Sequence, residues 1–233
     1  MHHQISHEPA FSMLRVDLDP GDIFVSEAGA MAAKSTHVQM DAKLTVRPNA
    51  GFVTTLGAMF AAFIRKALGG ESFFVTHYTT NAPGTVWITP TMSGSIVHRR
   101  LEPGQRLTLS AGAYVASSGD IDVIVKYAGL RGILAKEGAF FLEILGNGGD
   151  IWFNSYGGVD AIDVNGTYIV DNGHIVGWEG ALTFDIKSAG GGLIGMVASG
   201  EGMVCEFKGQ GRVYIQSRNF GSLIDWLSPL LPG

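Results

Sequence analysis

The chain has 233 residues and a formal net charge of −5, and only 16% of its residues are charged, against roughly 25% in average domains. The negative balance disfavours long-range attraction to a nucleic-acid backbone, and the single cysteine, Cys205, excludes an intrachain disulfide and a cysteine-rich metal site. The low charge content is consistent with a large core under a neutral, glycine-rich exterior, or with a surface that is buried by self-association or rests on a membrane; we expect a homo-oligomer.

The N-terminal residues have no basic stretch followed by an apolar run, so we expect no secretory signal peptide. Together with the single cysteine, this favours a reducing, cytoplasmic location, with a peripheral membrane position as the alternative. No apolar run reaches the ~20 residues that span a bilayer, so no transmembrane helix is predicted.

Glycine accounts for 33 residues, about twice the usual share, and the glycines lie between short apolar runs, as is typical of turns between strands. Three sequence patterns recur three times in the same order. The first pattern is a tight turn that begins a strand, at residues 18–25, 101–109 and 164–170. The second is a glutamate before an apolar run, at 71–75, 137–142 and 201–205. The third is a glycine followed three positions later by an aromatic residue, at 84–89, 149–154 and 211–216.

These patterns predict an all-β fold with three tandem β-repeats in a pseudo-threefold arrangement. We expect one compact domain over residues 1–233, with repeats at roughly 10–98, 99–161 and 162–220 and a short C-terminal tail at 221–233. Each repeat is too small to bury a good core alone, so the repeats should pack around a shared interior.

The first repeat carries about twenty extra residues, within 51–70. Phe52, Leu56, Phe60 and Phe63 are spaced by four, four and three positions, which places them on one face of a short apolar helix. Three roles stay open for this helix: packing inside the protein, contact between protomers, or binding to a membrane surface with Arg65 at the headgroups. The four apolar residues are the candidate partner or membrane contact.

Further turns and strands are predicted along the chain. Asn147-Gly148, Asn165-Gly166 and Asn172-Gly173 are dipeptides typical of hairpins, because both residues tolerate positive φ. The apolar tail segment 223–231 admits the same three roles as the insertion. Strands are predicted at 73–78, 85–89, 120–127, 168–170, 181–186 and 212–216.

The histidines and acidic residues favour structure over chemistry. None of the seven histidines has metal-ligand spacing, and a shared site for His77 and His174 is less plausible than two structural histidines. The acidic pairs flank turns, where aspartate bonds to its own backbone more often than it performs acid/base catalysis. The pairs in question are Asp17 with Asp19 and Asp160 with Asp163.

The recurrence of Glu71, Glu137 and Glu201 in register also indicates a shared structural role. Cys205 lies in an apolar run and is expected to be a buried small residue. We therefore predict no catalytic residue, no metal and no cofactor, and a protein that is not an enzyme.

Five segments taken together resemble the altered-inheritance-of-mitochondria family over nearly the whole chain. They are residues 69–74, 137–141, 154–158, 170–174 and 209–218. The resemblance implies a fold like that of the tryptophan RNA-binding attenuation protein (TRAP-like), in which a double-stranded β-helix or sandwich-like unit is repeated within the chain. It supplies no catalytic residues, and similarity of fold does not transfer tryptophan or RNA binding to this chain.

The sequence thus predicts a non-enzymatic scaffold or binding protein that self-associates and contacts a membrane or a protein partner through apolar loops. The alternative is a small-ligand or RNA-binding module like the namesake of the fold. Nucleic-acid binding is disfavoured by the charge, and the identity of any small ligand stays open.

Overall fold

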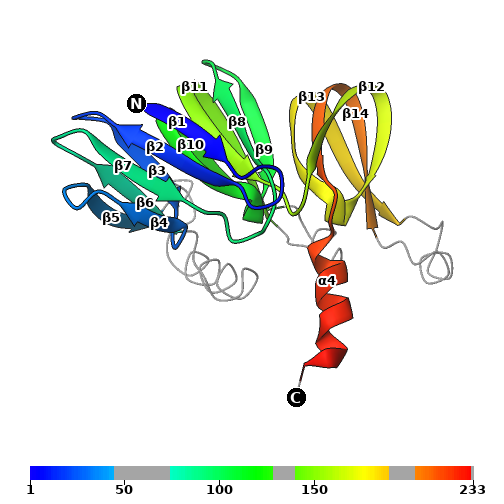
Figure 1. Cartoon of the computed structure of the whole chain (residues 1–233). Helices are drawn as coiled ribbons and strands as arrows, with labels where there is room; N and C mark the ends of the chain where they lie inside the picture. The colour runs from blue at the N-terminus through cyan, green and yellow to red at the C-terminus, as the bar shows by residue number, and fades with distance from the viewer. Residues whose placement is uncertain (45–73, 128–139, 189–202, 232–233) are drawn as a thin grey trace, which may run out of the picture.

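The computed structural model describes residues 1–44, 74–127, 140–188 and 203–231 (Figure 1). These residues are mostly β-strand, with one short α-helix and three short 3-10 helices, which confirms the predicted all-β class. Within the described ranges, no helix is long and apolar enough to cross a membrane. The predicted helix with Phe52, Leu56, Phe60 and Phe63 and the glutamates Glu71, Glu137 and Glu201 lie outside the described residues.

The first part of the chain forms short strands because turn residues interrupt each apolar run. Along its second strand the buried residues alternate, with Leu14, Val16 and Leu18 all less than 2% exposed, as a strand with one face in the core requires. The strands are β1 (His2–Ser6), β2 (Met13–Leu18), β3 (Ile23–Glu27), β4 (Met31–Lys34), β5 (Gln39–Leu44), β6 (Phe74–Thr79) and β7 (Gly84–Ile88).

The second and third parts use longer strands. The second part contains β8 (Ile96–Leu101), β9 (Arg106–Ser110), β10 (Tyr114–Tyr127) and β11 (Phe140–Asn154). The third part contains β12 (Val159–Asp171), β13 (Ile175–Ser188) and β14 (Met203–Gln216). The helix α4 (Phe220–Leu227) follows, and the 3-10 helices are Ala111–Ala113, Asn172–His174 and Ser228–Leu230.

One pairing pattern occurs in three parts of the chain, which we define as residues 13–88, 96–154 and 159–216; β1 precedes the first of them. In the third part, β14 pairs antiparallel with β12 on one side and with β13 on the other. In the second part, β11 pairs with β8 and β9 on one side and with β10 on the other. In the first part, β7 and β6 together replace this long strand: β7 pairs with β2 and β4, and β6 pairs with β3 and β5.

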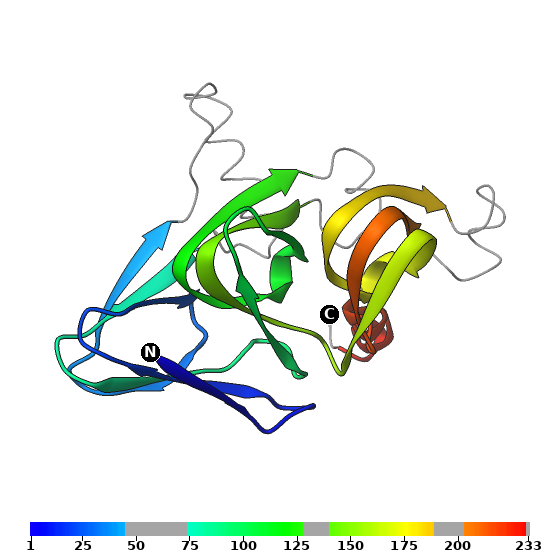
Figure 2. The same ribbon diagram turned by 90° about the horizontal axis from the view of Figure 1, so that it is seen from above.

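The parts are joined strand to strand in chain order. β3 pairs with β10, and β9 pairs with β13, so a ten-stranded sheet runs through all three parts in the order β12-β14-β13-β9-β11-β10-β3-β6-β5, with β8 on β11. The other sheet has the order β1-β2-β7-β4. Figures 1 and 2 show the parts in a row, with β4 at one end and β12 at the other.

The core falls into three clusters along this row. The first gathers residues of β2 and β7 around Trp152, and the second fills the middle part around Phe153 and Tyr114. The third packs Trp178 and Phe207 inside the last part. Apolar burial in these clusters is the main stabilising contribution to the fold.

Some predicted turns are bends inside strands, which corrects the hairpin prediction. Residues 164–170 are not a turn followed by a strand, because β12 runs continuously through Gly166, whose φ is +118°. Gly166 lies opposite Gly209 of β14, which also has a positive φ, so both strands bend together without losing their pairing. Likewise, Asn147-Gly148 lies within β11, and Asn172-Gly173 lies in a 3-10 helix.

The predicted strands at 73–78, 85–89, 120–127, 181–186 and 212–216 overlap β6, β7, β10, β13 and β14. The first two predicted strands begin and end within one residue of β6 and β7, and the other three lie inside the longer strands β10, β13 and β14. The tail at 221–233, by contrast, contains α4, which the apolar pattern of the tail did not predict as a helix.

Candidate functional site

A polar cluster lies on β8 and the facing half of β11. The register places Arg100 opposite Asp150 and His98 opposite Trp152. His98 Nε2 is 2.8 Å from Asp150 Oδ1, and Arg100 Nη1 donates to Asp150 Oδ2 at 3.0 Å. The His98 ring stacks on Trp152 at a centroid distance of 5.2 Å. Asp150 is therefore held between two basic side chains, which leaves it poorly placed to act as a free base.

Strand β1 brings a second histidine to this cluster. The ring of His3 lies 4.3 Å from that of His98 and 5.1 Å from that of Trp152. Burial lowers the pKa of His3, and the neighbouring His98 lowers it further, while Asp150 opposes the shift. The packing of His3 against His98 and Trp152 therefore favours the neutral form of His3, so acid should weaken this packing.

The next residue of β8 points to the opposite face of the sheet and forms a separate network. Nη2 of Arg99 donates to both carboxylate oxygens of Glu179, at 3.0 and 2.9 Å. The hydroxyl of Tyr214 donates to Glu179 Oε1 at 2.8 Å. Burial, followed by this bond to a carboxylate, raises the pKa of Tyr214 to about 12. The network ties the second part of the chain to the third, which is a structural role.

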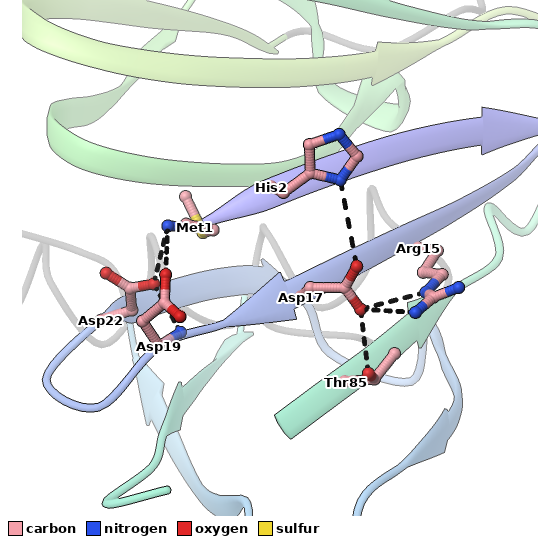
Figure 3. A network of polar contacts seen from close by, with 7 residues as sticks. All are labelled: Met1, His2, Arg15, Asp17, Asp19, Asp22 and Thr85. Atoms are coloured by element: carbon pink, nitrogen blue, oxygen red, sulfur yellow. Dashed lines mark hydrogen bonds and ion pairs between the residues drawn. The ribbon is translucent and has the colours of Figure 1, made fainter. Parts of the chain in front are cut away.

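The aspartates considered as catalytic pairs have separate partners. Asp17 binds Arg15 Nη2 at 2.9 Å and accepts a hydrogen bond from Thr85 Oγ1 at 2.9 Å (Figure 3). Asp19 binds the amino group of Met1 at 3.0 Å instead. These contacts join β2 to β7 and to the start of β1. They involve an arginine, a threonine and the amino group of Met1, and so differ from the bonding of aspartate to its own backbone that the sequence predicted.

The other acidic pair and the two histidines are equally dispersed. Asp163 Oδ1 accepts from Arg212 Nε at 2.7 Å, and this bond lowers the pKa of Asp163; Asp160 is exposed. His77 lies on β6, whereas His174 Nδ1 is 2.7 Å from the carbonyl oxygen of Gln216. Across the described ranges, no group of three or more His, Cys, Asp or Glu side chains is arranged to hold a metal ion.

Cys205 is buried, as predicted. It is 1% exposed in the core of the third part, and burial raises its pKa to about 12. A thiol in this state is a poor nucleophile.

The C-terminal helix α4 is the most exposed apolar element that the structure describes. Asn219 caps it, because the Asn219 side chain accepts a hydrogen bond from the backbone N–H of Ser222 at 3.1 Å. The helix projects away from the sheets (Figure 1), and none of its side chains is buried. Trp226 is 67% exposed, and Leu230 and Leu231 beyond the helix are 64% and 59% exposed.

The apolar residues of α4 follow helical spacing. Phe220, Leu223, Ile224 and Leu227 are three or four positions apart and share one face, while Ser222 and Asp225 lie away from it. The ring of Phe220 contacts that of Tyr156 at 6.3 Å, which links this helix to the segment between β11 and β12. An amphipathic helix with an open apolar face is suited to binding another surface.

Sequence reasoning located the apolar tail but missed both polar networks. Arg99 and Glu179 are 80 positions apart, and no local pattern links them. His98 and Arg100 pair with Asp150, and Arg99 pairs with Glu179, so each of these ion pairs joins segments about 50 to 80 positions apart.

Comparisons with known proteins agree with this architecture. A crystal structure of a protein from Streptococcus pyogenes is similar over 99% of both chains, with a TM-score of 0.77 and 28% sequence identity. A protein of Streptococcus pyogenes serotype M6, described as uncharacterised, is 28% identical over 235 aligned positions, covering 100% of this chain and 92% of the relative.

The family comparison is the most specific. The model of the family described as "Mitochondrial biogenesis AIM24" matches residues 3–218, from β1 to just before α4. The match covers the three parts of the chain in full, and the helix α4 begins immediately after it. The chain therefore belongs to the mitochondrial biogenesis AIM24 family.

Proposed function

We propose that this protein is a non-enzymatic scaffold that self-associates and attaches to a membrane surface through α4. The exposed apolar face of α4, on a body with few charges, is the observation that carries the proposal. The proposed lack of catalysis is supported by the ion pairs that occupy the carboxylates of Asp17, Asp19, Asp150 and Glu179.

The residue types of α4 favour binding to lipid over binding to a partner that is recognised by charge alone. Asp225 is the one charged residue in the helix, and Trp226, whose amphipathic ring suits the interfacial region of a bilayer, is its most exposed side chain. Such a helix can lie in the plane of the interface with its apolar side ~5–10 Å into the lipid. Because it has no basic residue, binding should depend little on anionic lipid.

Vesicle flotation tests this proposal. Wild-type protein should float with vesicles of neutral phosphatidylcholine and equally with vesicles containing phosphatidylserine. Ile224→Asp, which places a charge on the apolar face, should lose flotation. Thr183→Asp adds the same charge to an exposed position of β13, outside the helix, and should keep it. Absence of wild-type flotation with both vesicles, or equal flotation of the two variants, would count against membrane attachment through α4.

We also propose that the three parts of the chain are copies of one TRAP-like β-unit. Their shared pairing pattern supports this proposal. A second support is a register shift near the start of β4, β10 and β13, the strands that follow the turn or 3-10 helix in each part. The shifts lie between Met31 and Ala33, between Tyr114 and Ala116, and between Ile175 and Gly177.

The alternative function, a small-ligand or RNA-binding module, lacks comparable support. The basic residues of β8 that would contact a phosphate are engaged, Arg99 by Glu179 and Arg100 by Asp150. The net charge of −5 adds a long-range repulsion against RNA.

A further inference from the structure

The two junctions between the parts of the chain are built in the same way. At the first junction β10 pairs with β3, and at the second β13 pairs with β9, each over three residue pairs. The pairs are Ala116 with Ser26, Ser117 with Val25 and Ser118 with Phe24, and then Gly177 with Leu109, Trp178 with Thr108 and Glu179 with Leu107.

Both junctions begin with a small residue directly after the register shift. A Cβ atom on Gly177 would lie 2.4 Å from the carbonyl oxygen of Thr108, so the two backbones approach too closely for a larger side chain. Ala116, at the same position of the first junction, is fully buried. The second junction therefore requires the small size of Gly177, and the first junction has the small, buried Ala116 at the same position.

The first part carries an unused copy of this surface. β4 has the same register shift, and Ala33 occupies the position of Ala116 and Gly177. β4 is the edge strand of its sheet, and Ala33 is exposed. Among the described residues, no strand pairs with this side of β4, yet the position holds a small residue.

The third part carries the matching half. Residues 168–170 of β12 stand where residues 24–26 of β3 and 107–109 of β9 stand in the two junctions, just before the turn or 3-10 helix. β12 is the last strand of the ten-stranded sheet. Two large apolar side chains on opposite faces of this strand are exposed, Tyr168 at 43% and Ile169 at 58%. An exposed apolar edge strand is a template for pairing with another chain.

We propose that β12 of one protomer pairs antiparallel with β4 of a second copy of this chain. The register of the internal junctions places Val170 opposite Ala33, Ile169 opposite Lys34 and Tyr168 opposite Ser35. The two edges lie at opposite ends of the row of parts (Figures 1 and 2), so they meet between copies. This inference rests on the proposed self-association and assigns it a surface. The contact is head-to-tail, so assembly closes as a ring or grows as a filament.

Disulfide cross-linking tests the register. A mixture of the single variants Ile169→Cys and Lys34→Cys should form a covalent dimer under mild oxidation, because directly paired Cα atoms lie within disulfide reach. A mixture of Thr167→Cys and Lys34→Cys, two residues out of register, should lose most of this product. Native Cys205 is 1% exposed and stays out of the exchange. Equal yields from the two mixtures, or no product from either, would overturn the proposed pairing.

Complementation tests the polarity of the contact. Ile169→Lys blocks the β12 edge and Ala33→Trp blocks the β4 edge, so each variant alone should be a monomer by light scattering while the wild type is larger. An equimolar mixture should form a dimer and nothing larger, since each variant retains the edge that the other lacks. Circular dichroism and thermal melting of both variants, with Thr183→Lys as a surface control, show that the fold is kept.

The outcomes separate this inference from the proposed function. A wild-type oligomer whose mass neither edge variant changes overturns the edge pairing but leaves self-association standing. In that case a lower mass for Ile224→Asp would assign the contact to α4. A wild type that is monomeric at every concentration overturns both.

Discussion

Removal of the Glu179 charge is the sharpest test of how the second and third parts are held together. Glu179 accepts two hydrogen bonds from Arg99 and one from Tyr214, and its side chain is 15% exposed. Glu179→Gln keeps the size of the side chain but leaves a single acceptor oxygen for these three bonds. The variant therefore isolates the contribution of charge and acceptor number.

The expected loss follows from the environment of each bond. The Arg99 side chain is 33% exposed, so water screens its ion pair, which contributes about 1 kcal/mol or less. Tyr214 is buried, and its bond to a carboxylate contributes about 1.5–3 kcal/mol. Since glutamine can still accept one bond, we expect a total loss of about 2–3 kcal/mol. For a chain of this length, that lowers the melting temperature by roughly 4–12 °C.

Thermal melting followed by circular dichroism measures this change. Asp163→Asn is the matched control, because Asp163 also binds an arginine, at 2.7 Å, but is 76% exposed. Its melting temperature should stay close to that of the wild type. If Glu179→Gln has the melting temperature of the wild type, or if both variants lose equal stability, the hydrogen bonds of Glu179 do not stabilise the fold.

Three further predictions concern pH and packing. Because the folded-state pKa of Tyr214 is raised to about 12, folding stability should fall as pH rises from ~10 towards 12, and Tyr214→Phe should flatten this slope in denaturant titrations. Burial and His98 lower the pKa of His3, so stability should fall as pH drops below ~6.5. Because burial also lowers the pKa of His77, His3→Gln should weaken this dependence, as measured by hydrogen exchange in β1, but not abolish it for the whole fold. Gly177→Ala should cost about 1–3 kcal/mol through its clash with β9, whereas Gly112→Ala, with open space around it, should cost much less in the same unfolding experiment.

The sequence predicted the fold class because strand signals are local. Alternating or continuous apolar runs bounded by glycine identified strands at 85–89 and 212–216, which overlap β7 and β14. The same rule failed inside the long strands. A glycine with positive φ is found both where a chain turns back and where a strand only bends, so the sequence does not distinguish the two cases. For this reason Gly166 is predicted in a turn, although β12 continues through it.

The candidate site was less predictable for two physical reasons. Ion pairs such as that of Arg99 with Glu179 depend on which strands are neighbours, and this is a property of the fold rather than of either segment. The helix α4 has eight residues, a length at which helical periodicity is hard to distinguish from a short apolar run. The apolar character of the tail was nevertheless visible, and with it the expectation of a contact surface.

The division of the core has a consequence for how the molecule comes apart. The third cluster draws its buried residues from the last part of the chain, except for Phe141 of β11, and the paired junction beside it spans only three residue pairs. The last part therefore has a core largely of its own. It joins its neighbour through these three pairs, through the Arg99–Glu179 ion pair, and through Val176 and Tyr214, which are buried in the second cluster. Loss of these contacts would release a compact module that carries α4 away with it, while the other two thirds of the protein stay folded.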